Sequence, residues 1–465
     1  MSRPTDFASL ALSPALIENV VGLGYTEMTP IQAAALPAIL EGRDLIAQAK
    51  TGSGKTAAFG LGLLNSLKVA ELQLHALVIC PTRELADQVG REIRSLARST
   101  PNVKLLTLCG GVPIRGHRES LEHGAHIVVG TPGRLRALAD KAWLVLDTLA
   151  VLVLDEADRM LEMGFEDDLR ALLQKAPEQR QTLLFSATYP EAIEQISQGY
   201  QRAPVRVTVD EAVGSEQLEQ LFFEVGIRAE DRMRAVHALL AKYRPESTLI
   251  FCNTKEECDT LARALRRAGA RTLALHGDLE QRERDEVLVV FANRSCSVLV
   301  ATDVAARGLD IAGLDCVINY ELSTDASVHV HRVGRTGRAG KRGLALSLFR
   351  PDDSYRLQRI EPGLPRPLQR KTLPALTADD SKLAEPSMAT LVIEGGRRDK
   401  LRAGDVLGAL TAGGAIAGDQ VGKIQVQETR TYVAVKRGLE QHALDALANG
   451  RIKKRRFRVS KVAAG

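Results

Sequence analysis

The sequence predicts an α/β protein with two tandem parallel-sheet domains, followed by a smaller α+β domain. Three observations support this prediction. Aliphatic runs alternate with helix-length segments from about residue 25 to residue 360, a proline-rich stretch interrupts this pattern, and the last 75 or so residues follow a different order of elements. A chain of 465 residues also exceeds what one hydrophobic core usually serves, so two or three domains are expected.

The aliphatic runs are apolar on both faces, which is typical of parallel strands covered by helices on both sides. They form two groups that part near residues 200–214, so we expect one domain over residues 1–208 and a second over 209–360. The expected strands are 76–80, 126–130, 152–155, 182–188, 248–253, 271–277, 297–303 and 316–320.

Residues 361–386 contain five prolines, at 362, 365, 367, 374 and 386. Proline interrupts regular helices, so this stretch is expected to be a linker.

The C-terminal segment, residues 387–465, has the order βαββαβ. Its expected strands are "MATLVIEGG", "VGKIQVQE", "TYVAVKRG" and the final run "RIKKRRFRVSKV" at 451–462, where Phe457 and Val459 share one face. Its expected helices are "AGDVLGALT" and residues 438–450. This order is that of a split βαβ sheet, as in RRM domains.

Composition narrows the possible classes of protein. The hydrophobic fraction of 45% and the charged fraction of 26% are ordinary for a soluble globular protein. No run of 18 apolar residues and no signal pattern is present, so we expect no membrane contact. The six cysteines are scattered, mostly in apolar runs, which predicts reduced core thiols rather than disulfides or a metal site, and therefore a cytoplasmic protein.

The positive charge lies mainly at the C-terminal end. Residues 387–465 hold 15 Lys/Arg and 7 Asp/Glu, a net charge of +8, whereas the whole chain carries +5 and the remainder therefore −3. A basic domain on a nearly neutral body favours a polyanionic partner.

The segment "AKTGSGKT" at 49–56 has the pattern of a phosphate-binding loop. Glycines let backbone N–H groups close around phosphate oxygens at a helix N-terminus. Lys55 would bring its ammonium to the β and γ phosphates, and the Thr56 hydroxyl would join the shell of a Mg²⁺ ion. We therefore expect ATP to contact Thr51, Gly52, Ser53, Gly54, Lys55 and Thr56.

An apolar strand ends on two adjacent carboxylates in "VLVLDEAD". Neighbouring residues of a strand point in opposite directions, so Asp155 and Glu156 can have different roles. Asp155 would hold Mg²⁺, partly through water, and Glu156 would orient and deprotonate the attacking water. Alone, such a pair is typical of a helix N-terminus, but its position about 100 residues after a phosphate-binding loop favours catalysis.

The segment "HRVGRTGR" at 331–338 offers arginines three residues apart. A fixed guanidinium charge suits a transferring phosphoryl group, so Arg335 and Arg338 are expected to stabilise its charge. From this segment alone, a solvated basic loop is an equally good interpretation.

These motifs, together with "PTRELA", "TPGR", "SAT" and "ATDVAARGLD", occur in the order found in DEAD-box RNA helicases, which the chain resembles over roughly residues 5–360. The resemblance implies two RecA-like domains and an ATP-dependent RNA helicase. It also implies that Phe7 stacks on the adenine, Gln32 reads its edge and Asp310 contacts the ribose. Asp158, Ser186 and Thr188 would then couple hydrolysis to domain closure.

The same resemblance implies a sugar-phosphate binding surface on both helicase domains. The residues concerned are Arg83, Gly111, Thr131, Gly133, Arg134, Gly277 and Thr302. Small and hydroxylated side chains suit contacts to a backbone without base readout.

The last domain resembles that of the bacterial DbpA type, in which it recognises a hairpin of large-subunit ribosomal RNA. An RRM usually stacks bases on aromatic residues of its first and third strands, but here only Tyr432 is available. We therefore expect basic loops to make the contacts, through Arg397, Arg398, Lys400, Arg402, Lys436 and Arg437.

The sequence thus predicts a monomeric, Mg²⁺- and ATP-dependent RNA helicase that binds ribosomal RNA and pre-ribosomal particles and acts in large-subunit assembly. Two alternatives stay open. One is an ATP-gated RNA scaffold that does not unwind, and the other is a general RNA chaperone of cold response or RNA decay.

Overall fold

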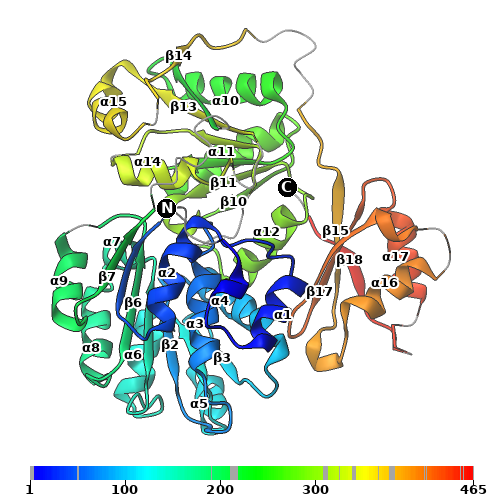
Figure 1. The fold of residues 1–465 in the computed structure, drawn as a ribbon. Coiled ribbons are helices and arrows are strands. Elements are labelled where there is room, and N and C mark those ends of the chain that lie inside the picture. Colours follow the sequence, from blue (N-terminus) through cyan, green and yellow to red (C-terminus); the bar gives the residue numbers. More distant parts are fainter. Residues whose placement is uncertain are drawn as a thin grey trace. The chain divides into compact units, whose positions relative to one another are not determined.

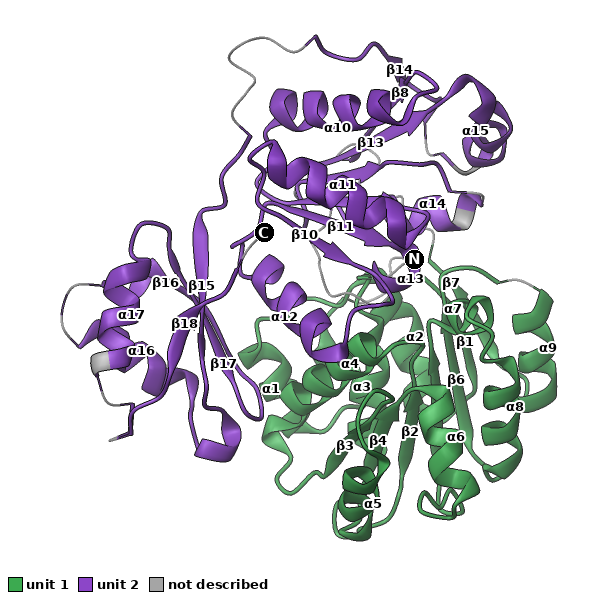
Figure 2. Ribbon diagram, turned by 180° about the vertical axis from the view of Figure 1, so that it is seen from behind, with its two compact units in different colours: residues 1–213, 308–310 green, residues 214–307, 311–465 purple. Residues whose placement is uncertain are grey.

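A computed structural model of the chain describes residues 5–49, 52–189, 191–209, 218–306, 313–323, 325–337, 342–364, 366–375, 383–412, 414, 416–450, 452–453 and 455–463. The chain divides into two compact units, one within residues 1–213 and the other within residues 214–465 (Figure 2). Among the described residues, no helix is both long and apolar enough to cross a membrane.

The first unit is built on a seven-stranded sheet in the order β3-β4-β2-β5-β6-β1-β7, and all its paired strands are parallel (Figure 1). Its strands are β1 (Leu45–Gln48), β2 (Ala76–Ile79), β3 (Leu105–Leu108), β4 (Ile127–Gly130), β5 (Val151–Asp155), β6 (Gln181–Ser186) and β7 (Val205–Thr208). Its α-helices are α1 (Pro14–Gly22), α2 (Pro30–Leu40), α3 (Lys55–Ser66), α4 (Arg83–Leu96), α5 (Ile114–Glu122), α6 (Pro132–Asp140), α7 (Ala157–Glu162), α8 (Glu166–Lys175) and α9 (Glu191–Tyr200).

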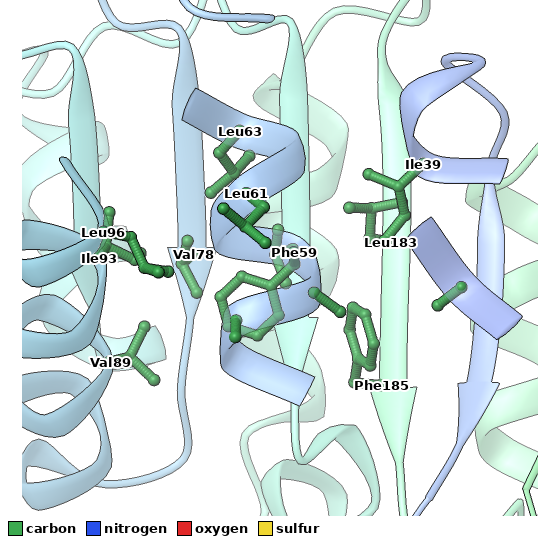
Figure 3. Packing of buried hydrophobic residues seen from close by; sticks show 14 of the residues in the cluster. Ile39, Phe59, Leu61, Leu63, Val78, Val89, Ile93, Leu96, Leu183 and Phe185 are labelled. Carbon is green, nitrogen blue, oxygen red and sulfur yellow. The ribbon is translucent and has the colours of Figure 1, made fainter. Parts of the chain in front are cut away.

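The core of the first unit explains why its central strands are apolar on both faces. One hydrophobic cluster includes Val78 of β2, Phe59 of α3 and Phe185 of β6, whereas Leu77 of β2 belongs to a second cluster on the other face. Figure 3 shows α3 lying over the sheet with Phe59 directed toward Phe185. The two rings are fully buried, and their centroids are 5.3 Å apart. This packing fixes the helix whose first turn follows the phosphate-binding loop.

The second unit holds another seven-stranded parallel sheet, in the order β10-β11-β9-β12-β13-β8-β14. Its strands are β8 (Leu218–Glu224), β9 (Thr248–Cys252), β10 (Thr272–Leu275), β11 (Val298–Thr302), β12 (Cys316–Asn319), β13 (Gly343–Phe349) and β14 (Arg370–Lys371). Its α-helices are α10 (Ala229–Tyr243), α11 (Lys255–Arg267), α12 (Gln281–Ala292), α13 (Asp303–Ala306), α14 (Ala326–Val333) and α15 (Ser354–Ile360).

Part of the segment expected to be a linker completes this second sheet. β14 pairs with β8, and the Phe222 N–H donates to the carbonyl of Gln369. Leu364 and Leu368 pack on a cluster that contains Phe222 and Ile360. The prolines prevent a helix, but the leucines between them bury enough apolar surface to hold the chain against the sheet edge.

The C-terminal segment forms a four-stranded antiparallel sheet in the order β16-β17-β15-β18, as expected for a βαββαβ chain. Its elements are β15 (Met388–Ile393), α16 (Ala403–Thr411), β16 (Val421–Val426), β17 (Thr431–Lys436), α17 (Glu440–Asn449) and β18 (Val459–Lys461). The last strand is shorter than predicted because Ile452 and Arg455 pair with each other in a turn. Phe457 and Val459 do pack on the core, as the alternation indicated.

The two faces of this small sheet are covered by different parts of the second unit. Figures 1 and 2 both show α16 and α17 on one face and α12 beside the other. Thr390 bonds to Asn293 at 3.2 Å and to Ser295 at 2.7 Å, and the Tyr432 hydroxyl donates to Glu286 of α12 at 3.2 Å. The sheet face that carries Tyr432 therefore packs against α12 and the residues that follow it.

The six cysteines are buried and form no disulfide, so the prediction of core thiols is confirmed.

Truncating Phe59 tests the central role of the α3–sheet packing. We expect Phe59→Ala to lower the free energy of unfolding of the first unit by about 3–5 kcal/mol, because it leaves a cavity in a fully buried cluster. The chain has one tryptophan, Trp143, which lies in the first unit, so urea titration with tryptophan fluorescence reports this unit alone. The control Val21→Ala, at a residue 65% exposed, should change it by no more than about 0.5 kcal/mol. A loss below about 1 kcal/mol for Phe59→Ala would contradict the assignment.

Candidate nucleotide and RNA sites

The loop between β1 and α3 is shaped to bind phosphate. Gly52 and Gly54 have positive φ angles of 87° and 94°, which a side chain would disfavour. Lys55 opens α3, is 6% exposed, and its ammonium donates to the Ala49 carbonyl at 3.1 Å. The helix N-terminus adds the positive end of its dipole. Loop, cation and helix end thus offer a cradle for a polyphosphate, while Thr51 lies outside the described residues.

Gln32 is joined directly to this loop. Its side-chain amide donates to the Gly54 carbonyl at 3.1 Å, and its Oε1 accepts from the Thr29 N–H at 2.9 Å. A Cβ added at Gly54 would come within 2.6 Å of the Gln32 amide nitrogen, so glycine is needed there for space as well as conformation. The amide is therefore held at the loop, where a hydrogen bond to a purine ring could replace one of these two bonds.

Phe7 is placed differently from the expectation of a ring open to a ligand. It lies in a short 3₁₀ turn, is 2% exposed and meets Tyr25 edge-on with a centroid distance of 6.4 Å. Among the described residues it belongs to the hydrophobic cluster beneath α2.

Asp155 ends β5 as a buried carboxylate. Burial, opposed by the attraction of Lys55 and aided by the neighbouring Glu156, raises its pKa to about 6. Its Oδ1 is buried and has no hydrogen-bond partner within the described residues. An unsatisfied carboxylate oxygen near an ammonium and a phosphate-binding loop is the chemistry that a hydrated Mg²⁺ ion would satisfy, with the Thr56 hydroxyl as a second ligand.

Glu156 adopts a left-handed backbone conformation, with φ of 52°, which is uncommon for a side chain of this type. Its Oε2 accepts a hydrogen bond of 2.7 Å from Arg159, and both side chains are almost fully buried.

The structure brings Asp158, Ser186 and Thr188 together. The Asp158 carboxylate accepts from the Thr188 N–H at 2.8 Å, the Thr188 hydroxyl at 2.9 Å and the Ala187 N–H at 3.2 Å. The Ser186 hydroxyl accepts from the Asp158 N–H at 3.3 Å. The end of β5 and the segment that leaves β6 are thereby joined by hydrogen bonds.

The expected RNA residues of the first unit lie at the other half of the same sheet edge. β3, β4 and β2 are neighbours, so the segments after their carboxyl ends are brought together. Gly111 follows β3, and Arg83 follows β2. Thr131, Gly133 and Arg134 follow β4. Arg134 donates to the Val112 carbonyl at 2.7 Å and to His117 at 2.8 Å. Sequence reasoning missed His117, because a single histidine on a polar helix carries no motif.

In the second unit, β10 and β11 are paired neighbours, which places Gly277 and Thr302 at one edge of that sheet. Arg335 is 4% exposed, whereas Arg338 and Asp310 lie outside the described residues. Arg332 was not predicted as a site residue, yet it is fully buried and ties together the ends of three strands. It donates to the Asp303 carboxylate at 2.6 and 2.7 Å, to Asn253 at 2.9 Å and to the Glu321 carbonyl at 2.6 Å.

The basic loop after β15 is held in place by its backbone while its side chains face solvent. The N–H groups of Arg397 and Arg398 donate to the carbonyls of Gln427 and Glu428. Their side chains are 67% and 75% exposed. A Cβ at Gly396 would come within 2.3 Å of the Gln427 carbonyl, so only glycine allows this close approach.

The other basic residues expected to bind RNA divide into two groups. Lys400, Arg402 and Lys436 are exposed, whereas Arg437 donates to the carbonyls of Pro386 and Met388 and so has a structural role. Lys453, from the basic run near the C-terminus, donates to the Lys400 carbonyl at 2.7 Å. The run is therefore part of the same basic surface as the loop, a contact that sequence order did not reveal.

Comparison with protein families matches three segments of the chain. Residues 29–196 match the DEAD/DEAH box helicase family, residues 231–340 the helicase conserved C-terminal domain, and residues 390–461 the DbpA RNA binding domain.

Two curated relatives match nearly the whole length of the chain. Over 458 residues the chain is 51% identical to the ATP-dependent RNA helicase DbpA of Escherichia coli K12, covering 98% of this chain and 99% of the relative. It is 34% identical over 478 residues to DbpA of Bacillus subtilis 168, covering 98% and 99%. Its fold is similar to that of S. cerevisiae Dbp5 bound to RNA and ADP BeF3, with a TM-score of 0.71 and 29% identity over 79% of this chain and 96% of that one.

The raised pKa of Asp155 predicts a stability that depends on pH. In the unfolded chain this carboxyl loses its proton near its ordinary value of 3.8, but in the ligand-free fold it keeps the proton up to about pH 6. The fold therefore binds more protons between these values, and its stability falls as pH rises through them. Asp155→Asn, which stays neutral, should be more stable than the parent above pH 6, and the gain should shrink toward pH 4.

Urea titrations between pH 4 and 8, followed by Trp143 fluorescence without nucleotide or metal, would measure this gain. Asp167→Asn, at an exposed carboxylate of α8, is the control and should show no such trend. A gain for Asp155→Asn that does not grow with pH would refute the expectation.

Proposed function

We propose a function for this chain, which belongs to the DbpA type of the DEAD-box family of ATP-dependent RNA helicases. The proposal is that its C-terminal domain directs it to a hairpin of large-subunit ribosomal RNA. There it separates short duplexes locally during assembly of the large ribosomal subunit. It acts as a cytoplasmic monomer on pre-ribosomal particles.

The observation that carries the targeting proposal is the placement of the C-terminal sheet. One face of this sheet carries four residues that alternate with the core residues of β15 and β17. Each of them is at most 6% exposed: Thr390, Val392, Tyr432 and Ala434. Packing of Thr390 and Tyr432 on the second helicase domain leaves no room for bases to stack there. The exposed basic surface is instead the loop with Arg397, Arg398, Lys400 and Arg402, joined by Lys453 and Arg455. Such a surface suits RNA of defined shape.

The hydrolytic step uses residues that end strands of the first unit. The loop of Gly52, Ser53, Gly54 and Lys55 holds the phosphates of ATP. Asp155 and Thr56 would hold Mg²⁺, which would supply positive charge to neutralise the phosphates. Glu156 accepts a proton from the water that attacks the γ-phosphorus, while ADP leaves with the electron pair of the broken bond. Arg335 and Arg338 of the second helicase domain stabilise the charge that develops on the transferring group.

Coupling of hydrolysis to unwinding follows from the shared sheet edges. Asp158 bonds to the segment after β6, so loss of the γ-phosphate at β5 changes the hydrogen bonds there. Closure of the two helicase domains around ATP and RNA would bend one strand of a duplex and release its partner, and phosphate loss would reopen them.

A charge-removal experiment tests the targeting proposal. Triple substitution of Arg397, Arg398 and Lys400 by alanine should weaken binding of large-subunit rRNA hairpins by about tenfold or more and reduce the salt slope of binding, because three phosphate-facing cations are lost. Fluorescence anisotropy at several salt concentrations measures both quantities.

The matched control removes the same charge from α11, by alanine at Arg263, Arg266 and Arg267, and should leave hairpin affinity within about twofold. For the parent protein, large-subunit fragments should stimulate ATP hydrolysis far more than small-subunit fragments of equal length. Equal stimulation by both would favour a general RNA chaperone instead.

Replacing the proposed base separates hydrolysis from binding. Glu156→Gln should reduce ATP turnover by about 10³-fold or more while preserving ATP-dependent RNA binding, since the amide cannot take a proton. Single-turnover hydrolysis and anisotropy in the presence of ATP measure the two effects. Glu166→Gln, at a half-exposed residue of α8, should behave as the parent. Near-normal turnover in Glu156→Gln would rule out this role.

A further inference from the structure

We propose that His117 is a positioning residue for RNA binding, which holds the Arg134 guanidinium against the Gly110–Gly111 turn by accepting a hydrogen bond at Nδ1. This inference rests on the proposed RNA contacts of Arg134 and Gly111, and it assigns a role to a residue that belongs to none of the motifs.

The geometry makes Arg134 the link between three segments. Arg134 lies in the first turn of α6, its Nη2 donates to the Val112 carbonyl at 2.7 Å, and its Nη1 meets His117 Nδ1 of α5 at 2.8 Å. Val112 directly follows Gly111, whose φ of 78° marks the turn after β3. With two of its nitrogens engaged, the guanidinium has a fixed plane, and the turn is fixed with it.

The hydrogen bond determines which form of His117 is present. An arginine has only donors, so Nδ1 must carry a lone pair and the ring must be neutral with its proton on Nε2. The surroundings favour this form, because partial burial and then Arg134 and Arg83 lower the pKa of His117 below its ordinary value of 6.5. On α5 itself, Arg115 and Arg118 pair with Glu119 and Glu122.

Arg83 strengthens the case that this cluster faces an anion. It opens α4 after β2, and its Nη1 is buried without a hydrogen-bond partner among the described residues, while its Nε lies 3.9 Å from Asp87. Two arginines near one neutral histidine form a cationic cluster at the sheet edge where RNA is proposed to bind. Neutrality of His117 then matters, because a protonated ring would repel Arg134 and could no longer accept its hydrogen bond.

The test compares two substitutions of His117 in the full-length protein. His117→Leu removes the acceptor, and His117→Asn keeps an acceptor oxygen near the place of Nδ1 but does not titrate. We expect His117→Leu to raise the RNA KM of the RNA-stimulated ATPase about five- to tenfold, the net value of one lost hydrogen bond, with little change in kcat. His117→Asn should stay within about twofold of the parent.

A pH series adds a readout that a purely structural role would not change. Between pH 7.5 and 5.5 the RNA KM of the parent should rise relative to that of His117→Asn, because protonation of His117 removes the acceptor only in the parent. Parallel pH profiles, an RNA KM of the parent that falls relative to His117→Asn on acidification, or equal defects in the Leu and Asn variants would each overturn the inference. Trp143 fluorescence in urea verifies that both variants are folded.

The variant Arg134→Ala tests the proposed RNA site independently of the role of His117. If this variant raises the RNA KM and His117→Leu does not, only the role of His117 fails. If Arg134→Ala leaves the RNA KM unchanged, the proposed RNA site itself is wrong, and the role of His117 fails with it.

Discussion

Parallel strands impose the constraint on which the site of the first unit depends. Because all strands of a parallel sheet run in one direction, every segment that follows a strand begins at the same edge. The order β3-β4-β2-β5-β6-β1-β7 divides this edge into two halves. The phosphate-binding loop, Asp155 and Ser186 follow β1, β5 and β6, whereas the proposed RNA residues follow β2, β3 and β4. ATP and RNA residues can thus be neighbours on one rigid support without sharing a loop.

The ATP half of this edge concentrates groups that cost stability. Asp155 is a buried carboxylate with an oxygen lacking a hydrogen bond, Glu156 has a left-handed backbone, and its ion pair with Arg159 is withdrawn from water. Each feature opposes folding when no ligand is bound. The packing of Phe59 and Phe185 directly behind the loop supplies compensating hydrophobic burial. The groups that cost stability and the hydrophobic packing that compensates for them therefore belong to the same unit.

The C-terminal domain shows how a familiar topology can change its binding face. Its βαββαβ order is that of an RRM, yet the sheet face that would bind RNA in an RRM carries Thr390 and Tyr432, which bond to the second helicase domain. The apolar and hydroxyl residues of this face suit a protein contact, while Arg397, Arg398 and Lys400 lie on the loop after β15. Tyr432 and Arg430 thereby join this domain to Glu286 of α12.

The sequence by itself determined the fold class, the order of the domains and the residues of the main motifs, because hydrophobic periodicity and glycine-lysine or paired-carboxylate patterns are local properties of the chain. It also identified Asp158, Ser186 and Thr188 as one group through the family resemblance. It did not single out strands β1, β3, β7, β8 and β13, which are short or lack distinctive flanking motifs.

Only the tertiary structure decided which residues meet across long distances in the chain. It buried Phe7 beneath α2, gave Arg437 a structural role, joined Lys453 to the basic loop and placed His117 beside Arg134. It also used part of the proline-rich stretch to complete a sheet. The physical reason is the same in each case: a side chain's partners depend on strand order and helix packing, which bring together residues whose sequence neighbours carry no record of the contact.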